Sequence, residues 1–226
     1  ISQITTLRER LPIGFKDRAI SFLPLCHVFE RMIEYFYMFK GVSIYYAQSL
    51  ETLGEDLKEI QPTIMPTVPR LLEKVYDKIL TKGSELKGLK KKLFFWAVEL
   101  GLKHEYNGKN GIWYEFQLAI ANKIIFNKWR EAVGGNIRFI VSGASALQER
   151  IAKIFTAAQM PVLEGYGLSE TSPVISVNLA HTKNAHYGTV GTVIPGVELK
   201  LVHEEGMREG EGEITIKGPN VMMGYY

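Results

Sequence analysis

Short apolar runs alternate with longer segments of helical periodicity through most of this 226-residue chain. Runs of mostly apolar residues predict buried strands at 18–23, 42–46, 62–66, 137–141 and 161–163. Apolar residues three and four positions apart predict helices at 28–40, 50–60, 112–132 and 147–159, and another that begins at Pro69. Because a helix that connects two strands makes them parallel, this alternation predicts an α/β fold with three layers, a mainly parallel sheet with flanking helices.

The pattern changes beyond residue 185, where glycines and prolines separate short runs of alternating residues. The runs 197–202 and 213–216 place apolar residues at every second position, which predicts strands with one buried side. We therefore expect an α/β unit at 1–184 and the start of a β-rich, barrel-like segment at 185–226.

Composition excludes several classes of protein. A formal net charge of +3 is too small to indicate a nucleic-acid partner. The single cysteine, Cys26, cannot form an internal disulfide and fits a reducing compartment, so we expect a cytoplasmic protein. No apolar run approaches the roughly 20 residues of a membrane span, and the first residues lack the pattern of a secretory signal.

The segment 163–173, Leu-Glu-Gly-Tyr-Gly-Leu-Ser-Glu-Thr-Ser-Pro, combines several chemically useful groups in a predicted polar turn. Its two glycines let backbone approach a ligand closely, and Tyr166 offers a flat face with a polar tip. The hydroxyl of Ser169 suits a phosphate, and the carboxylate of Glu170 suits Mg²⁺. Ligands of parallel sheets bind at the carboxyl ends of strands, where both this segment and Ser142 are expected. The segment predicts a site for a nucleotide and its metal.

This segment resembles the Tyr-Gly-x-[Ser/Thr]-Glu motif of the adenylate-forming superfamily, which includes acyl-CoA synthetases, luciferases and peptide-synthetase adenylation domains. Four further blocks resemble the same superfamily in its expected order: 22–30, 141–147, 190–198 and 212–226. The third block departs from the family pattern at Val193, where a proline is usual. Within the superfamily, Leu-Pro-Leu-x-His-x-x-Glu-Arg at 23–31 and the lysine-rich, aromatic insertion at 86–97 resemble the long-chain fatty acyl-CoA synthetases.

The resemblance implies a reaction in two halves. A fatty acid carboxylate attacks the α-phosphate of ATP to form acyl-AMP and pyrophosphate, and the thiol of coenzyme A then displaces AMP to form the thioester. The implied substrates are a fatty acid, ATP and coenzyme A, with Mg²⁺ bound to the ATP. The family's phosphate loop, ribose-binding aspartate and C-terminal lysine have no match here, so we expect a fragment of the large domain that does not turn over alone.

The resemblance also implies roles for the residues of the central motif. Glu170 matches the magnesium-binding glutamate, Ser169 the hydroxyl that contacts the α-phosphate, and Tyr166 the aromatic ring that stacks on adenine. Gly165 and Gly167 allow close approach of the backbone. Each residue also has a structural interpretation: a surface cap for Glu170, an N-cap for Ser169 and core packing for Tyr166.

Residues of two other blocks join this site by resemblance. Gly143, Ala144 and Ser145 match residues beside the adenine, and Glu164 is expected near the adenine amino group through backbone contacts. The alternative is a plain strand-to-helix turn with Ser145 as the N-cap. His27 matches the histidine near the acyl carboxylate and the path of the thiol, and with Ser169 and Glu170 it completes the expected catalytic set. Its alternative is a purely structural histidine.

Two segments keep two interpretations each. The helix expected at 28–39, rich in Phe, Tyr and Met, is either the wall of an acyl tunnel or ordinary core. A tunnel would favour long chains, because each buried methylene contributes about 0.8 kcal/mol. The segment 82–103, basic and then aromatic, either contacts a membrane surface or forms a solvated cationic helix with one buried face.

Functions of other classes fit less well. A serine hydrolase needs Gly-x-Ser-x-Gly, but Leu147 and Thr171 occupy the last glycine position after Ser145 and Ser169. A non-catalytic relative that binds an acyl group or a nucleotide stays open. So do relatives that use another acyl acid or transfer the acyl group to a carrier protein.

Overall fold

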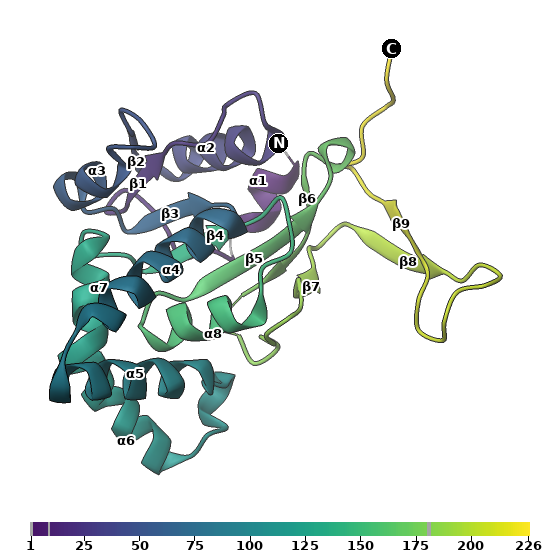
Figure 1. Ribbon diagram of the computed structural model, residues 1–226. Coiled ribbons are helices and arrows are strands. Elements are labelled where there is room, and N and C mark those ends of the chain that lie inside the picture. The colour runs from purple at the N-terminus through teal and green to yellow at the C-terminus, as the bar shows by residue number, and fades with distance from the viewer. Residues whose placement is uncertain (1, 9, 180–181) are drawn as a thin grey trace.

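The computed structural model describes residues 2–8, 10–179 and 182–226. Seven strands form one sheet in the order β2-β1-β3-β4-β5-β6-β7 (Figure 1). Their bounds are β1 Arg18–Ser21, β2 Ser43–Tyr46, β3 Ile64–Thr67, β4 Phe139–Ser142, β5 Val162–Gly167, β6 Val174–Asn178 and β7 Thr192–Val193. The first five strands run parallel, whereas β6 and β7 are antiparallel to their neighbours. The predicted mainly parallel sheet is confirmed.

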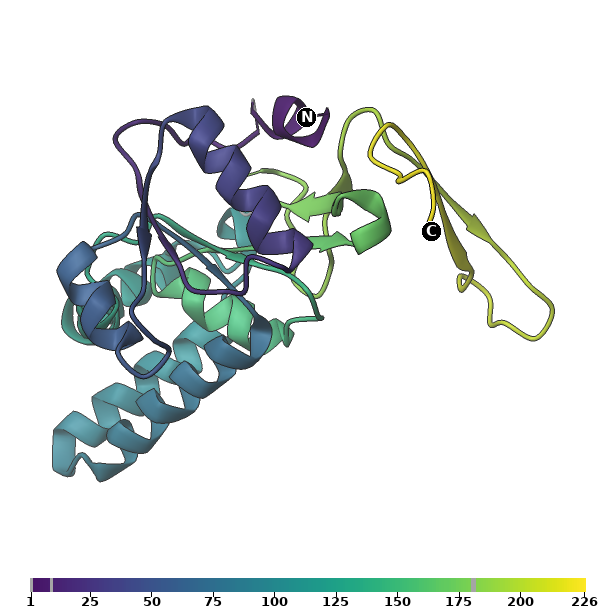
Figure 2. The same ribbon diagram turned by 90° about the horizontal axis from the view of Figure 1, so that it is seen from above.

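Helices cover both faces of this sheet, so the predicted three layers are present (Figures 1 and 2). One face carries α1 Ser2–Leu7 and α2 Val28–Lys40, the latter over the residues predicted. The other face carries α3 Leu53–Ile60, α4 Pro69–Glu85, α5 Gly88–Leu102, α6 Ile112–Ala121, α7 Asn127–Ala132 and α8 Glu149–Ala157. None of the helices in the described part of the chain has both the length and the hydropathy that a bilayer crossing requires.

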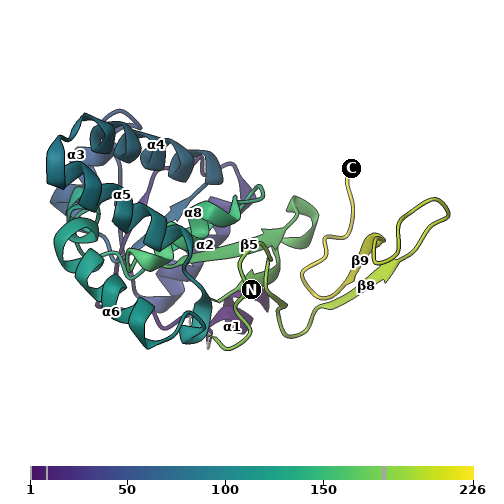
Figure 3. The ribbon, with the colours of Figure 1, turned by 60° about the horizontal axis from the view of Figure 1, so that its bottom comes forward.

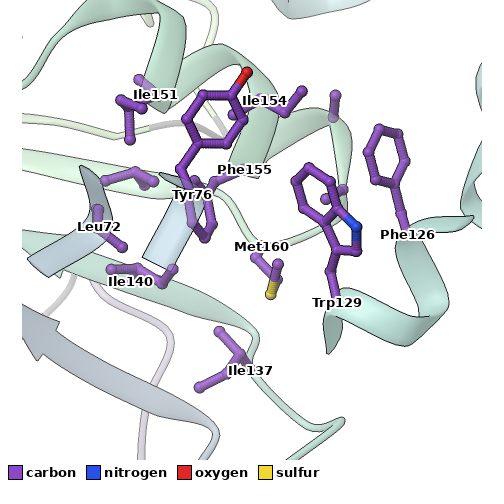
Figure 4. Packing of buried hydrophobic residues seen from close by; sticks show 14 of the residues in the cluster. Leu72, Tyr76, Phe126, Trp129, Ile137, Ile140, Ile151, Ile154, Phe155 and Met160 are labelled. Atoms are coloured by element: carbon purple, nitrogen blue, oxygen red, sulfur yellow. The ribbon is translucent and has the colours of Figure 1, made fainter. Parts of the chain in front are cut away.

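The core between the sheet and α3–α8 is rich in aromatic rings (Figure 4). Trp129 meets Tyr76 and Phe126 edge-on, with ring centroids 6.4 and 5.0 Å apart. Edge-to-face pairs add to the stabilisation that burial alone supplies. Three residues of α8 were predicted to point inward from their helical spacing, and all three are buried: Ile151, Ile154 and Phe155.

Several predicted boundaries are wrong. The strand expected at 161–163 continues to Gly167, because residues 164–167 pair with the unpredicted strand β6. Tyr166 therefore belongs to a strand and not to a turn. Leu50, expected on the buried side of a helix at 50–60, precedes α3 and is 65% exposed. The helix expected at 112–132 is interrupted by a π-helical turn, η2 Asn122–Phe126.

The β-rich character expected beyond residue 185 is present in the form of short strands. Strand β7 extends the large sheet by pairing with β6, so the sheet passes the boundary expected at 184. Strands β8 Glu198–Val202 and β9 Glu213–Lys217 form a separate antiparallel pair that projects from the α/β body (Figure 1). Most side chains of this pair are exposed.

Candidate active site

A pocket of about 280 Å³ opens at the carboxyl ends of β4 and β5, beside the start of α2. We call it the strand-end pocket. Three parts of the chain that are distant in sequence form its wall: residues 27–29, residues 143–144, and residues 165–170 with 173–174. The fold thus brings together all the residues predicted to form a site except Ser145 and Glu164. The position agrees with the general rule for ligand sites in parallel sheets.

His27 links the pocket to the start of α2. It is the N-cap residue of that helix, and its Nδ1 accepts a hydrogen bond from the backbone N–H of Phe29 at 3.3 Å. Because Nδ1 is the acceptor, a neutral His27 ring carries its proton on Nε2. The side chain is exposed and lines the strand-end pocket. His27 therefore caps a helix with one nitrogen and can donate a hydrogen bond to a ligand with the other.

The loop after β4 forms a second side of the pocket. Ala144 adopts a φ of 70°, in the left-handed region that residues with side chains seldom occupy. Gly143 packs against Phe29, because a Cβ at this glycine would meet that ring at 3.0 Å. The contact joins the β4 loop to the first turn of α2, so the two walls are held at a fixed separation.

Ser145 and Glu164 lie outside the pocket for different reasons. Ser145 is exposed beyond the turn, and it is not the N-cap of α8, because Gln148 holds that position. Glu164 is 7% exposed. Its neighbour Leu163 belongs to the core under α1 and α2, and successive side chains of a strand point to opposite faces, so Glu164 faces the α3–α8 side. Burial raises the pKa of Glu164 to about 7, so this carboxyl changes charge near neutral pH.

The two glycines of the central motif are not equivalent. A Cβ at Gly167 would lie 1.7 Å from the carbonyl oxygen of Pro173, so the turn closes only with glycine at this position. A Cβ at Gly165 would have its nearest neighbour, the oxygen of Ser142, at 3.9 Å, and therefore has room. Gly167 is explained by the close approach of the chain to itself. Gly165 instead leaves space on the pocket side of β5.

The turn that carries Ser169 and Glu170 is organised by a buried threonine. Residues Ser169–Thr171 form a short 3₁₀ helix, and Thr171 is 3% exposed. The hydroxyl of Thr171 accepts from the backbone N–H of Leu168 at 3.0 Å and donates to the carbonyl of Pro173. These bonds turn the side chains of Ser169 and Glu170 toward the pocket, which both residues line.

Two amide side chains from opposite ends of the chain hold the same turn. Nε2 of Gln3 donates to the carbonyls of Thr171 and Val174, both at 2.7 Å. Nδ2 of Asn220 donates to the same two carbonyls, at 3.0 and 3.2 Å. Gln3 and Asn220 are 4% and 3% exposed, so these bonds are shielded from water. Sequence reasoning gave neither residue a role; the only available signal was the position of Asn220 in the block 212–226.

The carboxylate of Glu170 also has a partner from the end of the chain. The hydroxyl of Tyr225 donates to Oε1 of Glu170 at 2.6 Å, and this bond lowers the pKa of Glu170. The backbone N–H of Met222 donates to the carbonyl of Glu170 at 2.8 Å. The bond from Tyr225 favours an ionised carboxylate at the mouth of the pocket, and the bond from Met222 holds the backbone of the same residue.

The donor set suits a metal that is held mainly by its ligand. Among the described residues no group of three His, Cys, Asp or Glu side chains converges, so a dedicated metal cage is absent there. A single carboxylate is what Mg²⁺ needs when phosphates and water supply the remaining oxygens. Glu170, with Ser169 beside it, fits that requirement.

A second, apolar cavity lies behind the strand-end pocket. It encloses about 50 Å³ between α1, α2 and the sheet. Phe29, Gly165 and Val174 line both spaces, so they form the partition between them. Beyond the partition the lining consists of apolar and aromatic side chains, including Met32 and Phe36 of α2.

Comparison with known proteins identifies the family to which this fold belongs. The AMP-binding enzyme family model matches residues 1–226. Long chain acyl-CoA synthetase 3 of Arabidopsis thaliana is 37% identical over 219 residues, 93% of this chain and 32% of that protein. Long-chain-fatty-acid–CoA ligase 1 of Homo sapiens is 35% identical over 92% of this chain and 30% of that protein. The chain thus spans about a third of the length of these relatives.

Solved structures share the fold at lower sequence identity. A long-chain-fatty-acid-CoA ligase from Archaeoglobus fulgidus superposes with a TM-score of 0.66 at 17% identity, over 100% of this chain and 39% of that one. O-succinylbenzoate coenzyme A synthetase from Bacillus subtilis, in complex with ATP and magnesium, gives 0.62 at 18% identity, over 99% of this chain and 37% of that one. With the family model matching every residue, this chain belongs to the AMP-binding enzyme family.

Proposed function

We propose that this chain is part of an enzyme that activates a long-chain fatty acid with ATP and transfers the acyl group to coenzyme A. One observation carries the proposal most directly. A carboxylate, a hydroxyl, an aromatic ring, a histidine and exposed backbone all line the strand-end pocket. An apolar cavity lies directly behind this pocket. Such an arrangement suits a polar nucleotide on one side and an acyl chain on the other.

In the adenylation half, the nucleotide occupies the strand-end pocket. Tyr166 offers its ring to the adenine, and the backbone of residues 143–144 and 165–167, which line the pocket, approaches the base. The hydroxyl of Ser169 donates a hydrogen bond to the α-phosphate. The fatty acid carboxylate attacks the α-phosphorus, the bond to pyrophosphate breaks, and acyl-AMP remains. The protein contributes chiefly by positioning the reactants and neutralising charge.

Glu170 is the proposed ligand of Mg²⁺. When bound, the metal neutralises phosphate charge as the phosphorus–oxygen bond breaks. The bond from Tyr225 supports this role because it favours the ionised carboxylate, and the bond from Met222 fixes the backbone that carries it. Because Tyr225 occupies one carboxylate oxygen, Oε2 is the atom we assign to the metal.

The acyl chain enters the apolar cavity along α2. His27, at the start of that helix, donates from Nε2 to the carboxylate and keeps it at the boundary between the two spaces. The cavity of about 50 Å³ has to widen for a long chain, by movement of α2 side chains such as Met32 and Phe36. In the second half of the reaction the thiolate of coenzyme A attacks the acyl carbon, and AMP leaves.

The test uses the full-length enzyme that contains this chain. We expect AMP and thioester to form from ATP and coenzyme A, with the rate highest on long-chain acids and lost in Glu170→Ala. Glu205→Ala, which removes an exposed carboxylate of the β8–β9 connection, is the matched control. Activity confined to short or aromatic acids would change the acyl assignment and retain the adenylation chemistry. Failure to form AMP with any of the acids would contradict the proposal.

We also propose a cytoplasmic location with peripheral contact at a membrane, made by the segment 82–103. The support is a set of exposed lysines with exposed Leu86 and Leu89. Binding to liposomes by the full-length enzyme, compared with Lys90, Lys91 and Lys92 changed to Glu, tests this contact. Unchanged binding after the charge reversal would contradict it.

The division into 1–184 and 185–226 likewise remains a proposal. The separate pairing of β8 with β9 supports it, whereas β7 ties residues 192–193 to the large sheet. Limited proteolysis that first releases a fragment beginning near residue 184 is the expected result. Protection of this connection until the whole chain unfolds would argue for one unit.

A further inference from the structure

The outer side of α6 carries a continuous apolar stripe. Five large side chains share one side of α6 and the turn after it, because their positions recur every three to four residues. They are Ile112, Trp113, Phe116, Ile120 and Ile124, with exposed fractions of 90, 72, 57, 39 and 39%. Trp113 and Phe116 stack on each other, with ring centroids 5.7 Å apart. We call these five residues the α6 stripe.

The α6 stripe is not needed to hold α6 in place. The opposite side of the helix buries Tyr114, Leu118 and Ala121 against α5. The hydroxyl of Tyr114 donates to the carbonyl of Leu100 at 2.9 Å, which fixes α6 to the end of α5. Figures 1 and 3 show α6 as the outermost helix, with α5 between it and the rest of the body. Large exposed apolar patches on such a helix indicate a binding surface.

A groove continues the α6 stripe toward α4. It encloses about 450 Å³ between α4, α5 and the turn η2, and Ile124 belongs to both the groove and the stripe. Apolar side chains from all three elements form much of its lining, while Lys82, Lys90 and Lys128 also line it. The π-helical turn η2 helps to shape this groove, and such turns often occur at functional sites.

Positive charge concentrates around the same surface. Residues 82–128 contain nine lysines and four glutamates, an excess of five positive charges in a chain whose net charge is +3. The remainder of the chain therefore carries a small negative net charge. Long lysine side chains can lie along apolar surface and keep their ammonium groups in water. A basic rim around an apolar, aromatic stripe matches an anionic lipid surface in both charge and polarity.

We propose that the α6 stripe and the adjoining groove bind an anionic phospholipid surface, with Trp113 and Phe116 entering the interface and the groove lysines contacting lipid headgroups. This assigns the membrane contact to a different helix from the one that the sequence suggested. In α5 the aromatic part is turned inward, since Phe94, Ala97 and Val98 are buried. The lysines of 82–103 serve as the rim of the surface, and α6 provides its apolar centre. The inference goes beyond the proposed reaction and is tested without substrates.

The first measurement is co-sedimentation of the full-length enzyme with phosphatidylcholine vesicles, with and without phosphatidylserine. Binding should rise with the anionic lipid and fall with salt. Trp113→Gln with Phe116→Gln should weaken binding by on the order of tenfold or more, because two aromatic anchors are lost. Lys90→Glu with Lys128→Glu should weaken binding to a similar degree, on the order of tenfold, only when phosphatidylserine is present. The matched control, Lys183→Glu with Lys200→Glu, reverses two exposed lysines outside this surface and should bind like the parent.

The second measurement places Trp113 directly. Brominated lipid should quench tryptophan fluorescence of the parent, and most of this quenching should be lost in Trp113→Phe, because Trp129 is buried in the core and Trp96 packs against it. Vesicle binding that both double variants leave unchanged, or that the control weakens equally, would overturn the proposal. Self-association that requires Trp113 in the absence of vesicles, without lipid quenching, would assign the stripe to a second copy of the chain. Shielding of Trp113 from acrylamide before vesicles are added would show that another part of the full-length protein covers it, which also overturns the proposal.

The enzyme assay separates this inference from the proposed function. With detergent-dispersed fatty acid, Trp113→Gln with Phe116→Gln should retain the parent rate, since neither residue lines the strand-end pocket. Loss of vesicle binding with retained activity supports the lipid surface. Absence of activity in every variant and in the parent would count against the proposed reaction alone. The binding result would be unaffected.

Discussion

The side of the sheet beneath α3–α8 and the side beneath α1 and α2 carry different kinds of core. The first packs aromatic and aliphatic side chains closely, as around Trp129 (Figure 4). The second contains the apolar cavity and three buried polar side chains, Glu30, Glu34 and Tyr37. Each of these three has an oxygen without a hydrogen-bond partner among the described residues. The α3–α8 side also has such oxygens, on Asn127 and Thr156, but its centre is packed with rings, whereas the α1–α2 side keeps an apolar cavity beside its buried polar groups.

The difference shows how the fold divides its tasks. A closely packed layer gains dispersion and burial energy, because few voids remain between its side chains. A cavity and buried polar groups cost stability on the other side, where the strand-end pocket opens. The site therefore lies on the side of the sheet that carries these costs, and the aromatic core of the other side offsets them. Five predictions test this contrast, in order of decreasing effect.

Truncation of a core ring should cost more on the α3–α8 side. Phe155→Ala should lower the free energy of unfolding by about 3–5 kcal/mol, as large-to-small changes in packed cores do. Phe36→Ala, equally buried but beside the apolar cavity, should cost at least about 1 kcal/mol less, because fewer packed atoms surround it. Urea denaturation of both variants measures the difference. Equal losses would show that the two cores do not differ in packing.

On the side of the site, the largest effect should be on activity and not on stability. Glu170→Ala should reduce kcat/KM for MgATP by on the order of 10²–10³-fold, since a metal ligand stabilises charge in the transition state. Unfolding should change little, because the residue lies at the mouth of the pocket. Steady-state kinetics with magnesium titration measures this. A rate restored by excess magnesium would fit weakened metal binding, and an unchanged rate would remove Glu170 from the site.

The amide pair Gln3 and Asn220 should couple stability to activity. Each single change to Ala should cost about 1–3 kcal/mol, because buried bonds to the carbonyls of Thr171 and Val174 are lost. The double variant should depart from additivity, since both amides serve the same acceptors. The KM for MgATP should rise more than kcat falls, because the turn carrying Glu170 loosens. Strict additivity with unchanged KM would mean that the amides act only on folding.

Filling the space beside Gly165 should change acyl preference. Gly165→Val is expected to fold, since a Cβ there meets nothing closer than 3.9 Å, and to narrow the partition between pocket and cavity. Long chains should lose about tenfold or more in kcat/KM relative to short ones. Gly167→Ala is the contrasting control, because its Cβ would meet the Pro173 oxygen at 1.7 Å and the turn would have to open. Equal effects of Gly165→Val on all chain lengths would contradict this use of the cavity.

The smallest expected effect, when it is expressed per pH unit, is a pH dependence of stability shared by both sides of the sheet. Burial raises the pKa of Glu30, under α2, and of Glu164, under α8, to about 7 in each case. Because the folded state binds these protons more tightly than the unfolded state, stability should fall as pH rises from about 4.5 to 7. Each carboxyl contributes at most about 1.4 kcal/mol per pH unit. Glu30→Gln and Glu164→Gln should each flatten the curve of urea midpoint against pH. If neither substitution changes the curve, the raised pKa values of Glu30 and Glu164 are refuted.

Local sequence patterns predicted much of the fold. The helix at 28–40 was predicted over its observed residues, because the spacing of its apolar residues is a local signal. Strand β6 was missed, since residues 174–178 are buried on both sides and show no alternation. The extension of β5 to Gly167 was missed for a related reason. Its glycines resemble a turn, and only pairing with β6 makes them a strand.

For the candidate site, the sequence by itself determined the chemical groups. The motif at 163–173 and the blocks around His27 and Gly143 contain the carboxylate, hydroxyl, ring and imidazole, and their order along the chain indicates the family. Only the tertiary structure decided which of these groups share a pocket, that Glu164 and Ser145 lie outside it, and that Gln3 and Asn220 hold its turn. The physical reason is the sequence separation over which each kind of interaction acts. Periodicity, caps and glycine act over a few residues, whereas bonds between positions 168 and 46 residues apart form only when the chain folds back on itself.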